Sequence, residues 1–352
     1  MRMIMISIGI AFFHSVLLIP VIINFCKFYS LYDTVNARKI HSGNIPRLGG
    51  IAIAVAFLAG IIFCVFMSND ISAMNSVPLL FAGTIIFTFG IIDDLFNMRA
   101  LFKLFVQIVA SLIVVACGFR FTQVFGWILP VPVSLVVSFF WILGIVNAYN
   151  LIDGMDGLCG GLSLTTLLTI GVVMKGSFLE GTAICFVLCA AILGFLVYNL
   201  PCPNAKIFMG DGGSQFLGFM VATVALYPVE GVIEYNKALM MLVLVSFPMI
   251  DTIAAIWRRL REHRGIMSPD RQHLHHKLLN FGFNKVQVLF IILAIQVMLC
   301  VTAIVSASYE RRITVFFLAI AYIFMIAFFC FIHFANAALN RKIARREAEK
   351  EA

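Results

Sequence analysis

Residues 286–307 read VQVLFIILAIQVMLCVTAIVSA, an apolar run without a charged side chain. A transmembrane helix needs about 20 mostly apolar residues, so this run is long enough to cross a bilayer. Runs of the same character recur near residues 3–26, 50–67, 79–93, 101–118, 130–148, 158–174, 181–198, 214–230, 238–257 and 313–334. The sequence therefore predicts an all-α integral membrane protein with about eleven transmembrane helices.

The composition supports the same class. Hydrophobic residues make up 62% of the chain and charged residues 12%, whereas soluble domains carry roughly 25% charged residues. We expect a single membrane domain over residues 1–352, because the longest polar stretch, 258–285, is too short to form a soluble module. The nine cysteines include no CxxC pair, which argues against zinc or redox motifs.

The loop charges predict the orientation. One set of loops, together with the tail 335–352, holds 19 of the 25 Lys and Arg residues. Basic loops face the cytoplasm, so the N-terminus is expected outside and the C-terminus inside. The net charge of +8 then reflects these loops, and no nucleic-acid partner is expected. The basic tail is predicted to extend the last helix and to bind anionic lipid head groups.

The first polar cluster is Asp93-Asp94, at the end of the apolar run LLFAGTIIFTFGII. Two adjacent carboxylates beside a hydrocarbon core are costly unless a cation or a proton joins them. The pair is therefore a candidate catalytic or metal-binding group. An ordinary pair of acids at a helix end is the alternative.

The second cluster has polar residues at every third position. Its members are Asn147, Asn150, Asp153 and Asp156. On a helical path they share one face, and two amides with two carboxylates suit hydroxyls, a nucleobase edge or a hard cation. Helix packing by asparagine is the alternative, but it leaves the two aspartates unexplained.

The third cluster is the segment FMGDGGS at residues 208–214, which opens the eighth predicted span. A glycine-rich backbone that enters a helix offers N–H groups to phosphate. Asp211 is placed to hold a metal ion beside that phosphate. A common glycine turn is the alternative.

The fourth cluster is the polar loop 258–285. Ser268-Pro269 is typical of a helix start and Gly282 of a helix end, so a short helix is predicted between them. Its candidate ligands for a diphosphate are Arg271, His273, His275 and His276. A zinc site and a merely solvated loop are the alternatives.

The fifth feature is the basic stretch RKIHSGNIPRLGG at residues 38–50. Lys39 is a candidate substrate-binding residue there, although positive charge flanking a span also explains it. Gly49-Gly50 is typical of close helix packing.

One further acid, Asp251, stands inside the ninth apolar run, where Pro248 is expected to kink the helix. An ionisable residue within a span indicates a functional site. Under the predicted orientation all these clusters fall on the cytoplasmic face. A transporter needs polar sites near the midplane and often shows inverted repeats, which the sequence lacks. The pattern therefore favours an enzyme over a transporter or a structural scaffold.

The ordered strings RKIHSGNIPRLGG, GIIDDLFNMRALFK, NAYNLIDGMDGL, IFMGDGGS, PMIDT and RQHLHH run from residue 38 to residue 276. As a set they resemble the polyprenyl-phosphate N-acetylhexosamine-1-phosphate transferases, which form part of glycosyltransferase family 4. The likeness is greater to the WecA/TagO branch than to the muramoyl-pentapeptide branch, MraY, because of the strings PMIDT and RQHLHH.

The resemblance implies a reaction in the inner (cytoplasmic) membrane. An N-acetylhexosamine-1-phosphate, with GlcNAc-1-phosphate expected, passes from a UDP-sugar to undecaprenyl or another polyprenyl phosphate, and UMP leaves. Mg²⁺ is the expected cofactor, with Mn²⁺ as an alternative. UDP-MurNAc-pentapeptide is the alternative donor. A homodimer is left open.

The resemblance also implies roles for single residues. Asp93 and Asp94 would engage the lipid phosphate or the metal, and Asp153 and Asp156 would take part in catalysis. Asp211 would be a Mg²⁺ ligand. The implied substrate-binding residues are Asn147, Asn150, Asn199, Phe208, Arg271, His273, His275, His276 and Lys39. Phe208 would stack on uracil. The stretch NLPCPNAKIFMGD departs from the expected spacing, and this leaves the nucleotide-binding role of Asn199 open.

Overall fold

The computed structural model describes residues 2–32, 45–68, 73–124, 126–176, 178–202, 204–227, 232–265, 268, 270 and 272–351. Two of the predicted site residues, Lys39 and Arg271, lie outside this part of the chain. Their roles therefore stay predictions.

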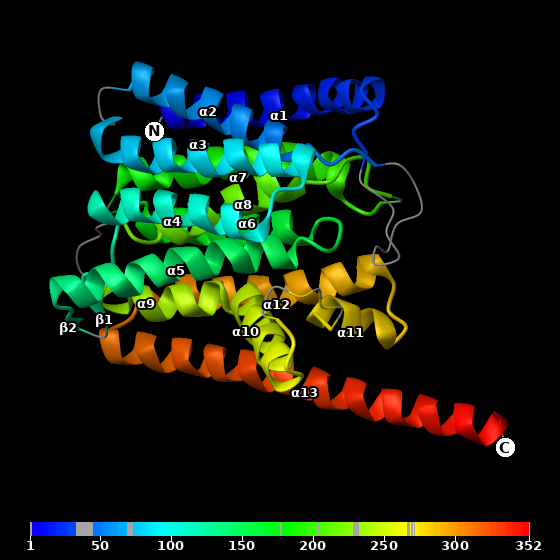
Figure 1. Ribbon diagram of the computed structural model, residues 1–352. Coiled ribbons are helices and arrows are strands. Elements are labelled where there is room, and N and C mark those ends of the chain that lie inside the picture. Colours follow the sequence, from blue (N-terminus) through cyan, green and yellow to red (C-terminus); the bar gives the residue numbers. More distant parts are fainter. Residues whose placement is uncertain are drawn as a thin grey trace.

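Helices make up almost all of the described structure. They are α1 (Arg2–Phe28), α2 (Gly50–Met67), α3 (Ala73–Phe96), α4 (Ala100–Ala116), α5 (Val131–Ile152), α6 (Leu158–Met174), α7 (Leu179–Asn199), α8 (Gly210–Val224), α9 (Val232–Leu244), α10 (Ser246–Arg261), α11 (Leu274–Asn280), α12 (Lys285–Ser306) and α13 (Arg311–Glu351). The strands β1 (Gln123–Val124) and β2 (Trp127–Ile128) form a small antiparallel hairpin. The long helices run side by side, and the two termini lie at opposite ends of the bundle (Figure 1).

The membrane class is confirmed by the length and apolar character of the helices. Among the described residues, seven helices are long and apolar enough to cross a bilayer, or eight if the bent pair α9–α10 counts as one span. The helices α4 and α6 are apolar but shorter, and α8 ends at Val224, before the end of its predicted span 214–230. A helix lies in the region of every predicted span. Because only seven or eight of the described helices meet the length and apolar criteria for a membrane span, the count of about eleven stays a prediction.

The helix α8 lies at the centre of the arrangement that forms the site. It packs against α3, α5 and α2, while α7 packs against α1, α2 and α6. From Gly212 to Val224 every residue of α8 is buried. Large apolar side chains on peripheral helices, such as Phe13 and Leu17 on α1, are exposed. These outer faces suit lipid, whereas the buried helix α8 holds the polar cluster in a fixed place.

The predicted ninth span, 238–257, is not one helix. The chain breaks at Val245, and α9 and α10 meet there at an angle of 72°. The break frees the carbonyl of Leu244, which accepts hydrogen bonds from Gln296 Nε2 at 2.8 Å and Thr166 Oγ1 at 3.4 Å. Pro248 lies in the first turn of α10 and has no N–H to donate to Leu244 O, four residues earlier. The expected kink is therefore confirmed, and it lies three residues before the proline. Helices break within membranes where neighbouring side chains satisfy the freed backbone groups.

Gln296→Leu is expected to lower the free energy of unfolding by about 1–3 kcal/mol, because a buried carbonyl loses its best donor. The measurement is the thermal midpoint in detergent. Thr302→Val is the matched control, since Thr302 lies on the same helix with an exposed hydroxyl bonded to Met298 O. Equal midpoints for the two variants would show that Gln296 does not stabilise the break.

The loop after α10 contains a shorter helix than predicted. The helix α11 begins at Leu274 rather than near Ser268, and His273 occupies its N-cap position. The acid that caps it is Asp251 from α10, whose Oδ1 accepts from Leu274 N at 2.9 Å. Gly282 follows the helix with φ +92°, which confirms it as the stop. At the C-terminus α13 continues to Glu351 and extends beyond the bundle (Figure 1), as predicted for the basic tail.

Candidate active site

The predicted acidic clusters converge at one end of the bundle. The last turn of α3, the first turns of α4 and α8, and the turn between α5 and α6 meet there, next to α11 and on the side of the C-terminus (Figure 1). This is the end that the sequence assigns to the cytoplasm. The contacts below show how each acidic side chain is held.

Asp94 caps the first turn of α8. Its Oδ1 accepts from Asp211 N and its Oδ2 from Gly212 N, each at 2.9 Å. We expected these glycine-rich amides to be offered to phosphate, but a carboxylate from α3 already occupies two of them. The predicted phosphate cradle is therefore wrong for the amides of residues 211 and 212.

The glycines around this turn let three backbones touch. A Cβ built on Gly50 would lie 2.5 Å from Gly213 Cα, and one built on Gly90 would lie 2.4 Å from Gly212 Cα. The predicted close packing at Gly49-Gly50 is confirmed, since Gly49 N and Gly50 N also donate to Phe208 O and Met209 O at 2.9 and 2.8 Å. The half-buried Phe208 is thus anchored through its backbone.

Lys103 joins two of the acids. Its Nζ pairs with Asp93 Oδ2 and, at 2.8 Å, with Asp211 Oδ2. Asp93 Oδ1 also accepts from Met98 N at 2.7 Å. In the sequence, Lys103 was interpreted only as one of the basic loop residues. The available signal was its place in the first turn of a helix that starts soon after the Asp93-Asp94 pair.

The amides of the second cluster are held on α5. Asn147 Nδ2 donates to Gln107 Oε1 at 2.7 Å, and Gln107 Nε2 donates to Gln215 Oε1 at 3.0 Å. Asn150 Nδ2 donates to Ser214 Oγ at 3.0 Å. These bonds connect α4, α5 and α8 through side chains, and they place Asn150 next to the Asp211 turn. Gln107 and Gln215 were not singled out in the sequence, because lone glutamines inside apolar runs carry no motif.

The acids of the second cluster lie in a turn. The helix α5 ends at Ile152, so the predicted helical stripe holds for the two asparagines but not for Asp153 and Asp156. Asp156 is buried and lies 3.6 Å from Lys285 Nζ. Burial, followed by the charges of Asp211, Asp94 and Asp156, raises the pKa of Asp153 well above its ordinary value. Four carboxylates thus repel one another in one site, and a cation would relieve this.

Asn199 supports the turn rather than facing open space. Its buried amide accepts from Gly157 N and donates to Ile207 O, each at 2.9 Å. It therefore ties the α5–α6 turn to the segment that precedes α8. Its predicted nucleotide contact stays a prediction.

The three histidines have different surroundings. His273 Nδ1 lies 2.8 Å from Asp251 Oδ2. His275 is 1% exposed, and neither of its ring nitrogens has a hydrogen-bond partner within the described residues. A Cβ built on Gly154 would lie 3.1 Å from His275 Nε2, so the histidine loop touches the α5–α6 turn. His276 is half-buried, with its ring 4.2 Å from that of His275.

His275 is neutral in the folded protein. Burial, followed by the neighbouring His276, lowers the pKa of His275 from 6.5 to about 3. The predicted role of His275 as a diphosphate ligand stays a prediction. Its side chain can accept a hydrogen bond from a ligand but adds no positive charge near neutral pH.

His275→Gln is expected to make stability less sensitive to acid. The unfolded chain binds a proton at this residue below pH 6.5 and the folded chain does not until about pH 3. Stability from this group is therefore complete above pH 6.5, and about 2 kcal/mol of it is lost at pH 5. The measurement is the fall in thermal midpoint between pH 7 and pH 5. His14→Gln, at an exposed site on α1, should keep the wild-type fall; an equal fall in both variants would contradict the assignment.

Comparisons with known proteins show which family the chain belongs to. The family model described as glycosyl transferase family 4 matches residues 76–229. A relative from Bacillus subtilis (strain 168), named probable undecaprenyl-phosphate N-acetylglucosaminyl 1-phosphate transferase, is 32% identical over 336 residues and 91% of each chain. The chain belongs to glycosyl transferase family 4.

Other relatives in the family carry a similar name. Undecaprenyl-phosphate alpha-N-acetylglucosaminyl 1-phosphate transferase from Escherichia coli (strain K12) is 31% identical over 87% of this chain and 83% of its own. The protein of that name from Yersinia pestis is 31% identical over 78% of this chain and 77% of its own. The matched region of the family model contains Asp93, Asp94, Asn150, Asp153 and Asp211, so the acidic site lies within the part that defines the family.

The site offers separate carboxylates rather than a complete metal cage. Within the described ranges, no group of three or more His, Cys, Asp or Glu side chains is arranged to hold a metal ion. The HLHH string therefore forms no such zinc cage in this part of the chain. Mg²⁺ usually binds through one or two carboxylates together with substrate phosphates. The Asp211 side chain is 37% exposed, so this carboxylate fits a Mg²⁺ site that substrate phosphates would complete.

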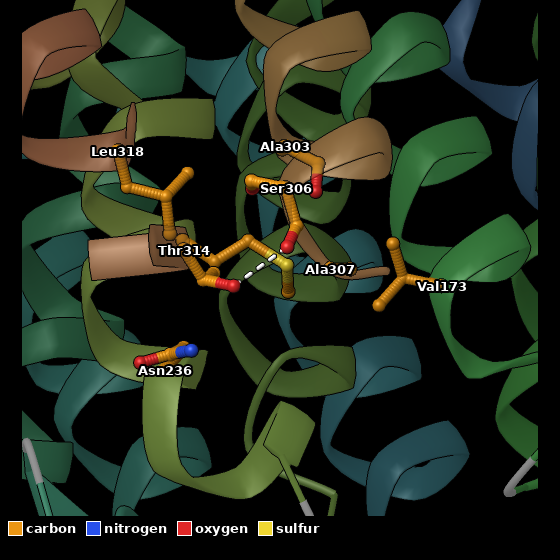
Figure 2. A pocket seen from close by; sticks show the side chains of 8 residues that line it. Val173, Asn236, Ala303, Ser306, Ala307, Thr314 and Leu318 are labelled. Carbon is orange, nitrogen blue, oxygen red and sulfur yellow. Dashed lines mark hydrogen bonds between the residues drawn. The ribbon is translucent and has the colours of Figure 1, made fainter. Parts of the chain in front are cut away.

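A small pocket at the other end of the bundle has a different character. It lies between α6, α9, α12 and α13, and Figure 2 shows Asn236, Ser306 and Thr314 around it. Thr314 Oγ1 donates to Ser306 O at 2.6 Å. The lining contains no ionisable side chain.

Proposed function

We propose that this protein transfers N-acetylglucosamine 1-phosphate from UDP-N-acetylglucosamine to undecaprenyl phosphate and releases UMP. One observation carries the proposal: the acidic site lies inside the region shared with relatives that bear this activity in their names. Their similarity extends over most of the chain. Undecaprenyl phosphate and the nucleotide sugar are therefore the proposed partners, with the bilayer as the solvent.

Different residues are proposed to bind the metal ion and to accept the proton. In this proposal Asp211 holds Mg²⁺, with the phosphates of the donor as further ligands. The metal supplies charge neutralisation at the transferring phosphoryl group. An oxygen of the lipid phosphate attacks the phosphorus next to the sugar, and the bond from that phosphorus to the bridging oxygen of UMP breaks. Direct displacement of this kind needs in-line positioning more than covalent help.

Asp153 is the proposed proton acceptor. It is half-buried in the turn at the site, and its pKa is raised by burial and by the neighbouring acids. A carboxyl with a raised pKa is a better base toward the last proton of a phosphate. Lys103, which already bridges Asp93 and Asp211, adds positive charge beside the transferring group.

The active site is proposed to face the cytoplasm of the inner membrane. The basic loops carry this inference, and a cytosolic nucleotide sugar requires it. Gln272→Cys in a cysteine-free background tests the side, because Gln272 is exposed in the loop before α11. An impermeant thiol reagent should label it only in broken cells. Glu310→Cys, exposed between α12 and α13 at the other end, should react in intact cells; the reverse pattern would invert the orientation.

The activity is tested with purified protein, UDP-N-acetylglucosamine, undecaprenyl phosphate and Mg²⁺. The expected products are UMP and a lipid-linked sugar diphosphate, both lost when EDTA is added. UDP-MurNAc-pentapeptide at the same concentration is the comparison donor, and its preferential turnover would assign the protein to the MraY-like reaction. Uptake of a UDP-sugar into proteoliposomes without UMP release would instead support a transporter.

A further inference from the structure

We propose that Asp94 is a positioning residue that clamps the first turn of α8 and so fixes the carboxylate of Asp211. This rests on the proposed function only where it concerns turnover. In this assignment Asp94 binds neither Mg²⁺ nor substrate. The two acids of the Asp93-Asp94 pair therefore have different roles, although they are neighbours in the sequence.

The first observation is that both oxygens of Asp94 are already engaged. One accepts from the amide of Asp211 and the other from the amide of Gly212. These amides belong to the start of a helix, where four N–H groups lack partners within the helix and the helix dipole favours a negative charge. The carboxylate thus satisfies two of these donors and lies at the end of the helix where a negative charge is favoured.

The second observation is the difference in access. Asp94 is 6% exposed, whereas the side chain of Asp211 is 37% exposed. A ligand that enters the site meets Asp211 first. Because Asp94 holds the backbone N–H of Asp211 itself, a shift of Asp94 moves the residue that carries the accessible carboxylate.

The third observation is that Arg47 and Gly210 hold Asp94 in place. Arg47 donates to the backbone carbonyl of Asp94, near the end of α3. Gly210, with φ +80°, lies against the same carboxylate: a Cβ there would lie 2.6 Å from Asp94 Oδ2 and 2.2 Å from Arg47 O. The left-handed backbone and the lack of space both require glycine. The end of α3, the start of α2 and the start of α8 are thereby locked together.

Asp93 provides a natural comparison. Its carboxylate bonds to Met98 N and pairs with Lys103, so it fixes the α3–α4 connection. Replacement of either acid by asparagine keeps the side-chain shape and removes one negative charge. Only the change at residue 94 replaces a carboxylate oxygen that accepts from the backbone of α8.

Hydrogen–deuterium exchange, followed by mass spectrometry of peptides that contain residues 211 and 212, tests the clamp without substrate or metal. In Asp94→Asn we expect exchange there to be at least about tenfold faster than in the wild type. In Asp93→Asn it should stay at the wild-type rate. Unchanged exchange in Asp94→Asn, or equally faster exchange in both variants, would overturn the proposal.

A second variant keeps the test valid if Asp94→Asn fails to fold. Gly210→Ala leaves the Asp94 carboxylate in the protein but displaces it from the α8 amides. The clamp predicts faster exchange at residues 211 and 212 and a fall in kcat, with the KM for the UDP-sugar within about twofold of wild type. If Asp94 acted as a ligand, its variants would instead change KM or the Mg²⁺ concentration for half-maximal activity while exchange stayed normal. Because the exchange measurement needs no substrate, it stands even if the proposed reaction is wrong.

Discussion

Asp211→Asn is expected to lower kcat by about a thousandfold, the effect of removing a principal electrostatic stabiliser of a transition state. The substitution keeps the shape of the side chain and its backbone contact with Asp94 but removes the charge that would hold Mg²⁺. It also breaks the ion pair with Lys103. The measurement is UMP release at saturating donor, lipid phosphate and Mg²⁺.

The control for Asp211→Asn is Glu310→Gln, an exposed acid at the opposite end of the bundle, which should turn over at the wild-type rate. Helix content and the thermal midpoint of both variants should stay close to wild type. Near-normal turnover of Asp211→Asn at saturating Mg²⁺ would remove this residue from the metal site. The role of Asp153 would then need to be tested first.

Gly90→Ala is expected to have the second large effect, on stability and activity together. Its new Cβ would lie 2.4 Å from Gly212 Cα and 2.9 Å from Gly212 N, so one backbone must move. Overpacking of this kind costs about 1–3 kcal/mol, and here the displaced turn carries Asp211. We expect a lower thermal midpoint in detergent and at least a tenfold fall in turnover.

Gly83→Ala is the matched control for Gly90→Ala. Gly83 lies on the same helix and faces the same partner, α8, but its added Cβ would meet Phe216 at 3.4 Å, an ordinary contact distance. Both variants gain the same helix propensity, up to about 1 kcal/mol. Only Gly90→Ala should lose stability and activity. If the two variants behave alike, the close approach of α3 and α8 is not what positions the site.

Sequence motifs located much of the site, but not the bonds that hold it. Asp93 and Asp94 were named as candidates from their position beside an apolar run, Asp153 and Asp156 from the spacing of polar residues, and Asp211 from the glycine-rich segment around it. Their neighbours in space were not, because Gln107 is a single polar residue in an apolar run and Lys103 ends the string GIIDDLFNMRALFK without an assigned role. Such residues become recognisable only when the fold brings α4 against α3 and α5.

The surroundings of the histidines in the loop before and within α11 could not be predicted from the sequence either. The string HLHH marked the loop as a candidate, but its residues looked equivalent in the sequence. Asp251, 22 residues earlier in the chain, holds His273, while the ring nitrogens of His275 are buried without a hydrogen-bond partner among the described residues. Burial depends on packing between helices, so the lowered pKa of His275 could not be predicted from the spacing of the histidines.

The helical membrane class and the positions of the helices could be predicted from the sequence alone, because the length of an apolar run is a local property that the bilayer selects. The sequence also predicted that the acidic clusters lie together at the cytoplasmic ends of the helices. The packed structure alone shows that the ninth span bends by as much as 72° and that Asp94 caps a helix 117 residues further along the chain. These features depend on hydrogen bonds between helices, and such bonds exist only after the helices have packed.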